Sequence, residues 1–271
     1  MINIRKVSSD DFSALRDLWT SVFHDDEFFL TAFFSNLSPA IEAFAAEYDG
    51  QFIGAAYILN IFTFKNGKTV LPCPYIYAVG VHPEFRGQGI GKKLTIACRD
   101  YCSEKYGLSC LVPATAELFD YYRRLDYVSA LYADEHTIER EGAINADISK
   151  LTPEKYGELR EQLLAGQPHM EYSSSALHFL EKLCDMAGGG LYLLRSNDDY
   201  AIAAVEYAET MFIKELLCSN DNARGFAAAL LWHEDCDSLT YRSFTKENPR
   251  DFGMLSKSLG NDPIYMGPAF D

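Results

Sequence analysis

The spacing of apolar residues predicts alternating strands and helices in the first half of the chain. Phe12, Leu15 and Leu18 recur at the spacing of an amphipathic helix, and the hydroxyls and acids of residues 8–11 favour a helix start there. The turn 49–50, Asp-Gly, separates two apolar runs, which is the signal of a β-hairpin. We expect helices at 8–22, 26–36, 89–106 and 116–125, and strands at 2–7, 43–48, 52–64, 70–81, 109–112, 127–132 and 136–141.

The second half of the chain repeats this plan in a weaker form. It follows a small, polar stretch at 142–147. The expected helices start at 151, 177 and 225, and the expected strands are 191–195, 200–208, 211–218 and 238–243. The matching order of elements indicates a degenerate duplication. We therefore expect an α/β protein with two domains, residues 1–144 and 145–271.

Composition places the chain in the soluble globular class. Hydrophobic residues make up 48% of it, no apolar run approaches the roughly 18 residues of a membrane span, and the N-terminus lacks the apolar core of a secretory signal. The net charge of -15 argues against nucleic acid, whose phosphates require a basic surface, and suits a cationic partner. The seven scattered cysteines have no zinc-type spacing, so we expect free thiols, no metal and a cytoplasmic location.

The segment 79–94 has a recognisable pattern: a strand, a glycine-dense loop and an amphipathic helix follow one another without a break. The N–H groups at such a helix start point outward and attract anions. Gly87, Gly89 and Gly91 let an anion approach the backbone without meeting Cβ atoms. Arg86 and Lys92 add positive charge. The segment is therefore a candidate pyrophosphate site.

Two common phosphate-loop motifs do not fit this segment. A Walker A loop needs glycine where Arg86 stands and a hydroxyl where Lys93 stands. A dinucleotide-binding fingerprint, read from either of the first two loop glycines, needs Gly or Ala where Lys92 or Leu94 stands. Neither nucleotide class is therefore predicted.

The loop closely resembles the acyl-CoA-binding motif of the GNAT superfamily of N-acetyltransferases. That motif is Arg or Gln, two variable residues, Gly, one variable residue, and Gly or Ala. The resemblance implies acetyl-CoA as cosubstrate and a mixed, mostly antiparallel sheet flanked by helices. It assigns the cofactor contacts of the loop to Arg86, Gly87, Gln88, Gly89, Ile90, Gly91 and Lys92.

The same resemblance gives a role to the strand before the loop. In GNAT proteins this strand parts from its neighbour at a β-bulge, and the pantetheine arm of the cofactor lies in the gap. Gly80 suits a bulge. The backbones of Val79 and Val81 would then pair with the pantetheine amides, and a free N–H there can polarise the thioester carbonyl. Pro113 suits the end of the neighbouring strand, because it cannot donate a ladder hydrogen bond.

The helix end before Asp126 resembles a later segment of the family. Alignment of Leu125 and Tyr127 places Tyr122 on the tyrosine that protonates the departing thiolate in many members, with Tyr121 as its alternative. Asp126 stands where glycine is usual. The competing interpretation is that Tyr122 packs on the sheet as an ordinary aromatic residue.

The general base is poorly specified. The acceptor ammonium must lose a proton before its nitrogen attacks the thioester, and the strand 75–77 carries no carboxylate where some GNAT members place one. Glu117 and Asp120 are interpreted as solvated helix acids, and His82 as a surface residue.

Two GNAT-like units in tandem, the second without the glycine loop, resemble the core of the enhanced intracellular survival acetyltransferases. In that family the terminal carboxylate reaches the first unit's site, which implies a catalytic role for Asp271. The alternative is that residues 265–270 merely finish the second sheet. The second unit's counterpart of the loop, 219–225, has one glycine and the acid Asp221. Because an acid repels pyrophosphate, we expect a single cofactor site.

These resemblances imply an enzyme that moves an acetyl group from acetyl-CoA to a small amine or a peptide amine by direct attack. No cysteine has a recognisable histidine partner for a covalent acyl-enzyme. Three alternatives stay open: another acyl donor, a thiol acceptor, or a non-catalytic acyl-CoA sensor. The acceptor is not specified, because fold analogy indicates only the donor. We expect no nucleic acid and no membrane as partner, and a homo-oligomer stays open.

Overall fold

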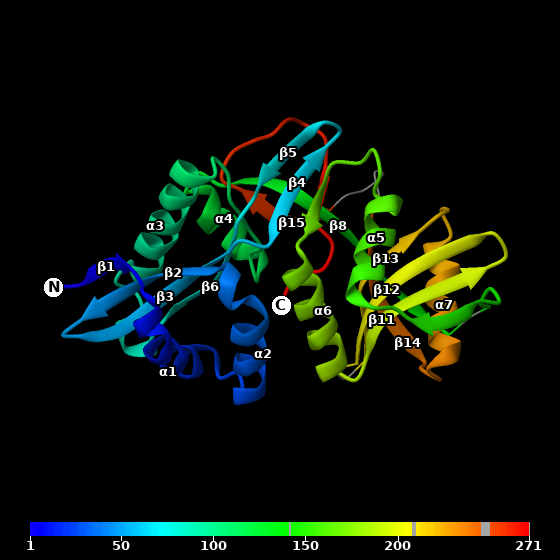
Figure 1. Cartoon of the computed structure of the whole chain (residues 1–271), viewed down its shortest axis with the longest axis horizontal. Helices are drawn as coiled ribbons and strands as arrows, with labels where there is room; N and C mark the ends of the chain where they lie inside the picture. The colour runs from blue at the N-terminus through cyan, green and yellow to red at the C-terminus, as the bar shows by residue number, and fades with distance from the viewer. Residues whose placement is uncertain (141, 208–209, 245–249, 271) are drawn as a thin grey trace. The chain divides into compact units, whose positions relative to one another are not determined.

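The chain folds into two compact units in the computed structural model (Figure 1). The structure describes residues 1–140, 142–207, 210–244 and 250–270. Unit 1 comprises residues 1–64, 70–129 and 253–260, and unit 2 comprises residues 65–69, 130–252 and 261–271. Residues 130–139 belong to a strand that pairs within unit 2.

Unit 1 contains the elements that precede this division. Its α-helices are α1 (Phe12–Phe23), α2 (Glu27–Leu37), α3 (Ile90–Lys105) and α4 (Ala116–Arg123). Its strands are β1 (Asn3–Lys6), β2 (Ile41–Tyr48), β3 (Gln51–Leu59), the first part of β4 (Phe62–Asn66), β5 (Thr69–Pro72), β6 (Tyr75–Val81) and β7 (Cys110–Leu111). Short 3-10 turns cover Ser9–Asp11, Ser38–Ala40 and Pro83–Phe85.

The sheet of unit 1 runs in the order β1-β2-β3-β6-β7-β15, where the last strand, β15 (Arg250–Leu255), returns from late in the sequence. The described neighbours are antiparallel except β6 and β7, which are parallel. Helix α3 packs on one face, where Ile90, Leu94 and Cys98 meet the strands in a buried core. Helices α1 and α2 lie on the other face (Figure 1).

Two long strands expected from the sequence are each split in two. The run 52–64 breaks between β3 and β4 at residues 60–61, where the Asn60 amide makes the last bond in the β2–β3 register, to the Ala40 carbonyl (2.9 Å). The run 70–81 breaks between β5 and β6, where Pro72 and Pro74 flank Cys73. Proline lacks the N–H that a continuous ladder requires.

Unit 2 repeats the plan. Its helices are α5 (Pro153–Leu163), α6 (Ser174–Met186) and α7 (Ala223–His233). Its strands are most of β8 (Val128–Glu139), β9 (Asp147–Lys150), β10 (His169–Tyr172), β11 (Gly190–Ser196), β12 (Asp199–Tyr207), β13 (Met211–Cys218), β14 (Ser238–Ser243) and β16 (Ile264–Tyr265).

The sheet of unit 2 runs β8-β14-β13-β12-β11-β9, and its described neighbours are antiparallel except β13 and β14. The parallel pair therefore occupies the place in unit 2 that β6 and β7 occupy in unit 1, as a duplication predicts. Helix α7 covers one face, with Phe226 and Leu230 in the core, and α5 and α6 lie on the other (Figure 1).

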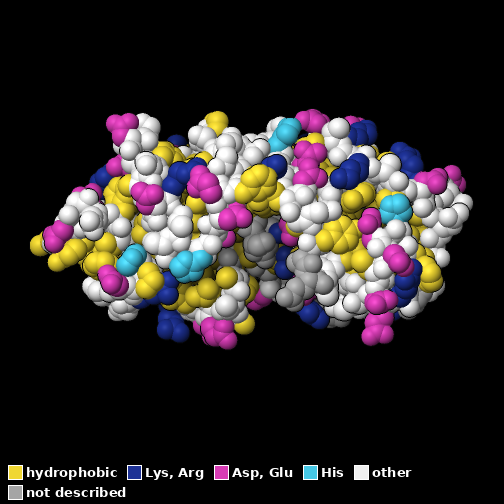
Figure 2. Space-filling view, turned by 90° about the horizontal axis from the view of Figure 1, so that it is seen from below, with side chains coloured by type: hydrophobic (Ala, Val, Ile, Leu, Met, Phe, Trp, Pro, Cys, Tyr) yellow, Lys and Arg dark blue, Asp and Glu magenta, His cyan; other side chains and the backbone are white. Residues whose placement is uncertain are grey.

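The helices and the charged surface residues bear on possible partners. In the described ranges no helix is long and apolar enough to cross a membrane. On the face in Figure 2, basic side chains are scattered among acidic ones.

Candidate functional site

The glycine loop of unit 1 connects the end of β6 to the start of α3. The strand stops at Val81, one 3-10 turn follows over Pro83–Phe85, and α3 begins at Ile90. Gly87 and Gly89 have φ angles of 78° and 73°. Residues with a side chain rarely adopt this left-handed backbone, so the loop conformation depends on glycine at both positions.

The first turn of α3 presents unpaired donors. Gly89 is the N-cap residue and has no side chain to cap the helix. The N–H groups of residues 87–92 donate to no acceptor in the part of the chain that the structure describes. A Cβ atom added to Gly87 or Gly89 would meet no atom within 4 Å, so both face open space. Because free N–H groups and the helix dipole attract anions, this turn fits a pyrophosphate.

Strands β6 and β7 separate beside this loop. Tyr75 and Cys110 form their one described ladder pair, and the Cys110 amide donates to the Pro74 carbonyl (2.9 Å). Beyond this point Tyr77–Val79 are partly exposed, although β6 lies in the middle of its sheet with helices on both faces. The sheet is therefore open along this edge of β6.

A β-bulge lies in β6 just before Gly80. Between the ladder pairs of Tyr77 and Gly80, β6 has two residues where β3 has one, and Ala78 takes up the extra length with a φ of 49°. The expectation that Gly80 itself forms the bulge is wrong. Gly80 is required for another reason, because a Cβ atom there would lie 2.8 Å from side-chain atoms of Val22 and Phe23 on α1.

The backbones of Val79 and Val81 point toward the open edge. The His82 amide donates to the Ile53 carbonyl (2.9 Å), and Gly80 pairs with β3 in the same register. Bonded residues alternate along an antiparallel ladder, so the intervening groups of Val79 and Val81 face away from β3.

The charged residues of the loop are exposed. Arg86 donates from Nε to the Val81 carbonyl (3.1 Å), which leaves its terminal nitrogens for a ligand. Gln88 and Lys92 are also exposed. Ile90 is 1% exposed and belongs to the core, so only its backbone can serve a ligand.

Helix α4 brings two tyrosines to different places. The Tyr121 hydroxyl lies beside the first turns of α3, 3.9 Å from the position that a Cβ atom would take at Gly91. The Tyr122 ring packs edge-on against Tyr121 (5.1 Å between centroids) and Tyr127 (6.1 Å). Burial raises the pKa of Tyr122 to about 12, so its phenol stays protonated at neutral pH. The role of Tyr122 as proton donor stays a prediction.

The remaining candidates for the general base are Glu117, Asp120 and His82. Hydrogen bonds from Thr115 and from its own backbone lower the pKa of Glu117, and Asp120 pairs with Arg123 at 2.7 Å on the surface of α4. His82 is partly exposed, and its Nδ1 atom is enclosed without a described partner. No sequence pattern indicated another carboxylate contact: Asp25, in the turn between α1 and α2, accepts a hydrogen bond from the Trp19 indole (2.8 Å).

The equivalent helix start in unit 2, that of α7, is capped by a side chain. The Asn222 side chain caps α7 by accepting from the Gly225 amide (3.1 Å), and the Asn222 amide donates to Asn220 Oδ1 (3.1 Å). Asp221 adds negative charge. Strands β13 and β14 pair again at Leu216 after a register shift beyond Ile213. A cavity of about 810 Å³ lies beside the loop, with Asn220, Asp221 and Ala223 in its lining. The single cofactor site stays a prediction.

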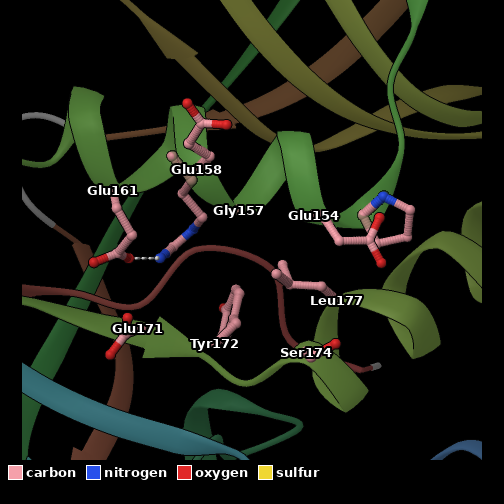
Figure 3. Close-up of a pocket in the computed structure, with 10 residues that line it drawn as sticks. Glu154, Gly157, Glu158, Glu161, Glu171, Tyr172, Ser174 and Leu177 are labelled. Atoms are coloured by element: carbon pink, nitrogen blue, oxygen red, sulfur yellow. Dashed lines mark ion pairs between the residues drawn. The ribbon is translucent and has the colours of Figure 1, made fainter.

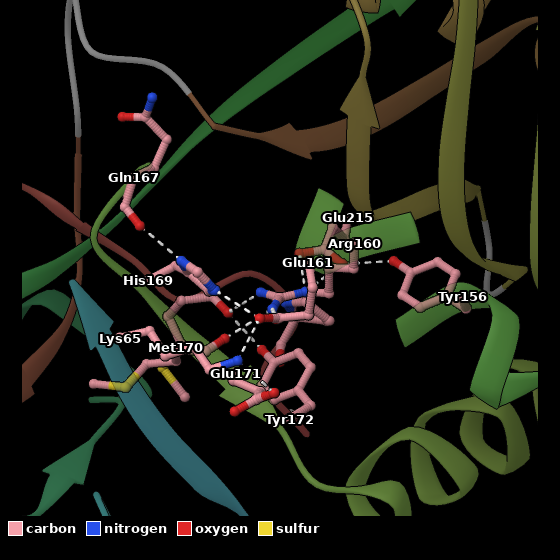
Figure 4. Close-up of polar contacts among 12 residues, drawn as sticks. Lys65, Tyr156, Arg160, Glu161, Gln167, His169, Met170, Glu171, Tyr172 and Glu215 are labelled. Atoms are coloured by element: carbon pink, nitrogen blue, oxygen red, sulfur yellow. Dashed lines mark hydrogen bonds and ion pairs between the residues drawn. The ribbon is translucent and has the colours of Figure 1, made fainter. Parts of the chain in front are cut away.

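The segment after β16 is fixed in the core of unit 2 by a buried ion pair (Figure 4). Arg160 and Glu215 are both at most 1% exposed and lie 3.1 Å apart. Arg160 Nη2 donates to the Met266 carbonyl (3.1 Å), and the Tyr172 hydroxyl donates to the carbonyls of Met266 (2.6 Å) and Pro268 (2.8 Å). Residues 264–270 therefore pack into the core of unit 2.

The path of this tail depends on Gly267 and Phe270. Gly267 has a φ of 79°, and a Cβ atom there would collide with the Glu215 carboxylate. Phe270 is 2% exposed and packs against Phe179 (5.1 Å between centroids). Asp271 lies outside the described residues, so its catalytic role stays a prediction.

A cavity of about 290 Å³ lies between α5, β10 and α6 of unit 2 (Figure 3). Its acidic lining residues are Glu154, Glu158, Glu161 and Glu171. Each carboxylate already has a polar partner: Lys65 contacts two of them at 2.7 and 2.9 Å, Lys155 a third at 2.8 Å, and the His178 ring the fourth at 3.1 Å. The two lysines offset only part of the negative charge of these four side chains.

Residues 3–130 match the family model described as the acetyltransferase (GNAT) domain. No curated protein sequence matches the chain.

Solved structures extend the fold similarity over both units. A probable N-acyltransferase from Enterococcus faecalis V583 gives a TM-score of 0.72 at 16% identity, covering 94% of this chain and 72% of that one. Eis1 from Mycobacterium abscessus gives 0.66 at 17% identity, with 94% and 73% covered. A tandem GNAT protein from the clavulanic acid biosynthesis pathway gives 0.54 at 11% identity, with 96% and 100% covered. The chain thus has a tandem GNAT fold.

Proposed function

We propose that unit 1 binds acetyl-CoA and that the protein transfers its acetyl group to a primary amine. The uncapped start of α3 carries this proposal, because its N–H groups have no acceptor in the described chain and its glycines leave room for a pyrophosphate. Arg86 and Lys92 would add charge-assisted contacts. Val79 and Val81 would bind the pantetheine amides along the open edge of β6.

The proposed acetyl transfer has the following steps. The amine nitrogen attacks the thioester carbonyl carbon, the carbon–sulfur bond breaks, and the acetyl group leaves on nitrogen. Tyr122 would give its proton to the departing sulfur, and its raised pKa keeps that proton in place until it is needed. An N–H of β6 would stabilise the charge that develops on the carbonyl oxygen.

Buried thiols favour direct attack over a covalent acyl-enzyme. Burial raises the pKa of the Cys73 and Cys98 thiols well above the usual range, so neither is a thiolate at neutral pH. The thiolate is the nucleophilic form of cysteine.

Asp271 is proposed to receive the proton that the ammonium loses. The variant Asp271→Asn removes only the side-chain charge and keeps the main-chain carboxylate on which the resemblance rests, whereas deletion of residues 270–271 removes both groups. A decrease in kcat for the deletion variant, with unchanged affinity for acetyl-CoA, would support this role. A full rate in the deletion variant would exclude it.

A thiol-release assay across a panel of amines tests the function. Release of free CoA thiol that depends on an amine, with acetylated amine detected by mass spectrometry, is the expected result. Saturable acetyl-CoA binding without turnover for every amine would favour the sensor alternative, and turnover with thiols alone would reassign the acceptor.

A further inference from the structure

The cavity of about 810 Å³ in unit 2 lies at the end of β13 and β14, beside the loop before α7. Its lining residues come from β8, β13 and β14, from the end of α5 and from the start of α7, and all of them belong to unit 2. The ladder between β13 and β14 skips Lys214 and Glu215 and resumes at Leu216. Unit 2 therefore has a hollow beside its parallel strand pair.

One wall of this cavity is a block of four polar side chains on neighbouring strands. Tyr241 and Ser243 of β14 lie opposite His136 and Asp134 of β8 in the antiparallel ladder, and all four residues line the cavity. Directly opposed side chains are neighbours on one face of a sheet. The next pair on the same face belongs to the apolar core under α7. This polar block therefore begins where that core ends.

The two residues of the polar block on β8 form an ordered acid–imidazole pair. Asp134 lies 2.7 Å from His136 Nε2. Asp134 also accepts from the Glu135 amide (3.0 Å) and has Arg250 Nε at 3.9 Å, so its carboxylate is already well partnered. Because Nε2–H donates to Asp134, Nδ1 of the neutral imidazole is a hydrogen-bond acceptor. Nδ1 makes no hydrogen bond within the described residues.

The two hydroxyls of the polar block on β14 are buried without a partner. Tyr241 and Ser243 are 4% and 7% exposed, and neither hydroxyl makes a hydrogen bond within the described residues. On the opposite face of the same two strands, Thr240 and Thr137 hydrogen-bond each other (2.9 Å). Buried polar groups nearly always have partners, because an unmade hydrogen bond is costly there. Two unpartnered hydroxyls on the wall of one cavity therefore point to a polar ligand.

The rest of the lining provides charges of both signs and an apolar side. Burial raises the pKa of Tyr241, and the charge of the nearby Arg224 guanidinium opposes this rise. The Asp221 carboxylate has no ion pair within the described residues. Leu163 and Leu164 supply apolar surface from the end of α5. A pyrophosphate has no cation to offer Asp221, whereas a zwitterion offers one group to each sign of charge.

We propose that this cavity binds a free α-amino acid with an apolar side chain. The hydroxyls of Tyr241 and Ser243 donate to its carboxylate, and His136 Nδ1 accepts from its ammonium. Arg224 adds positive charge for the carboxylate, and Asp221 adds negative charge for the ammonium. The leucines at the end of α5 contact the side chain of the ligand. The site goes beyond the proposed function, because that function uses only residues of unit 1 and the end of the chain.

Calorimetric titration of the full chain with L-leucine tests the site without enzyme activity. Saturable binding is the expected result. 3-Methylbutylamine, which is leucine without its carboxylate, should bind at least about tenfold more weakly, because charge-assisted hydrogen bonds are lost. 4-Methylpentanoate, which is leucine without its ammonium, should bind at least about threefold more weakly. No saturable binding of leucine, or equal affinity for either analogue, would overturn the proposal.

Variants of the hydroxyls separate a ligand contact from a structural role. Tyr241→Phe and Ser243→Ala should each weaken leucine by roughly threefold to tenfold, the loss of one hydrogen bond. Neither variant should lower the melting temperature, because each hydroxyl lacks a partner in the described chain. Thr240→Val is the matched control on the opposite face, and it should leave leucine affinity unchanged. Lower stability with unchanged leucine affinity in the two hydroxyl variants would contradict the proposal.

A pair of charge variants tests how the ligand is oriented. Asp221→Asn should weaken leucine by about twofold to fivefold, the effect of an exposed ion pair, and should not weaken 4-methylpentanoate. Asp198→Asn removes an exposed charge in the β11–β12 turn and should change neither affinity. Equal effects of the two variants on leucine would mean that only net charge matters, and would reject the contact between Asp221 and the ammonium.

Acetyl-CoA separates this site from the one proposed in unit 1. Gly89→Val should lose acetyl-CoA affinity and keep leucine affinity, and Ser243→Ala should do the reverse. Competition between acetyl-CoA and leucine, or loss of both ligands in Gly89→Val, would overturn the proposal of a separate amino-acid site. Leucine binding by a wild-type chain that binds no acetyl-CoA would reject the proposed function and support the amino-acid site.

Discussion

The two units of the chain share a sheet order but differ at the start of one helix. In unit 1 the loop before α3 has glycine at its N-cap, free N–H groups and an open edge on β6. In unit 2 the loop before α7 has Asn222 at its N-cap, which satisfies the Gly225 amide, and β13 pairs with β14 again at Leu216 after a register shift. Both central strands contain a bulge, so a bulge alone does not open a sheet.

This difference indicates which features produce an anion-binding site on this fold. The sheet order and the parallel pair position a helix start beside a strand end in both units. Only where the cap is missing and the strands part does the helix start remain available to an anion. A side-chain cap gives unit 2 a stable helix end, whereas unit 1 leaves the same donors for a ligand.

The largest expected effect on activity is that of Tyr122, the proposed proton donor of unit 1. Tyr122→Phe should lower kcat by roughly 10²–10⁴-fold with little change in acetyl-CoA affinity, because only the proton donor is lost. Since burial raises the Tyr122 pKa to about 12, the acid form is present below that pH and is lost only as pH rises through it. The deficit should therefore be equal at pH 7 and pH 9.

The neighbouring tyrosine is the control for that experiment. Tyr121→Phe removes a hydroxyl that lies near Gly91. It should affect cofactor affinity more than kcat. If Tyr121→Phe has the large kcat defect and Tyr122→Phe has almost none, the alignment of the helix end is wrong by one residue.

The next effect concerns the open helix start. Gly89→Val forces a β-branched residue into a φ of 73° and should weaken acetyl-CoA binding by about 100-fold or more, because at least one or two charge-assisted contacts are lost. Gly50→Val is a matched control, since Gly50 has a φ of 77° and equally open surroundings in the β2–β3 turn. Similar losses of affinity in the two variants, measured by calorimetry, would indicate general destabilisation.

A smaller change tests how closely a ligand approaches the helix. At Gly91 an added Cβ atom would lie 3.8 Å from the Val81 side chain and 3.9 Å from the Tyr121 hydroxyl, which are ordinary contacts. Gly91→Ala should therefore keep the thermal stability and weaken acetyl-CoA by about tenfold. An unchanged Kd would mean that no ligand atom approaches this position.

The smallest expected effect is in unit 2. Asn222→Ala removes the cap of α7 and should lower the free energy of unfolding by about 1 kcal/mol. It should not create a second acetyl-CoA site, because Asp221 remains. A second binding event in this variant would show that the cap alone excludes the cofactor.

The local parts of this account were predictable from the sequence. The glycine loop is a contiguous run whose backbone needs are written in its residues, and the helices and hairpins follow from short-range periodicity. The positions of α2, α3 and α4 were expected to within a few residues. Such features depend on neighbours in the chain.

The missed parts depend on contacts between distant residues. β15 pairs with β7 across more than a hundred residues, and β10 and β16 are too short to give a periodic signal. The hydrogen bond from Trp19 to Asp25 depends on the turn between two helices, and the sequence gives no sign of it. The same holds for Gly80, whose need for a small residue comes from packing against α1 and not from a bulge.

Titration of the wild-type chain with acetyl-CoA by calorimetry tests the central claim most directly. The account predicts saturable binding with a single site per chain, because the helix start is open in unit 1 and capped in unit 2. Two equivalent sites per chain, or no binding at all, would contradict it.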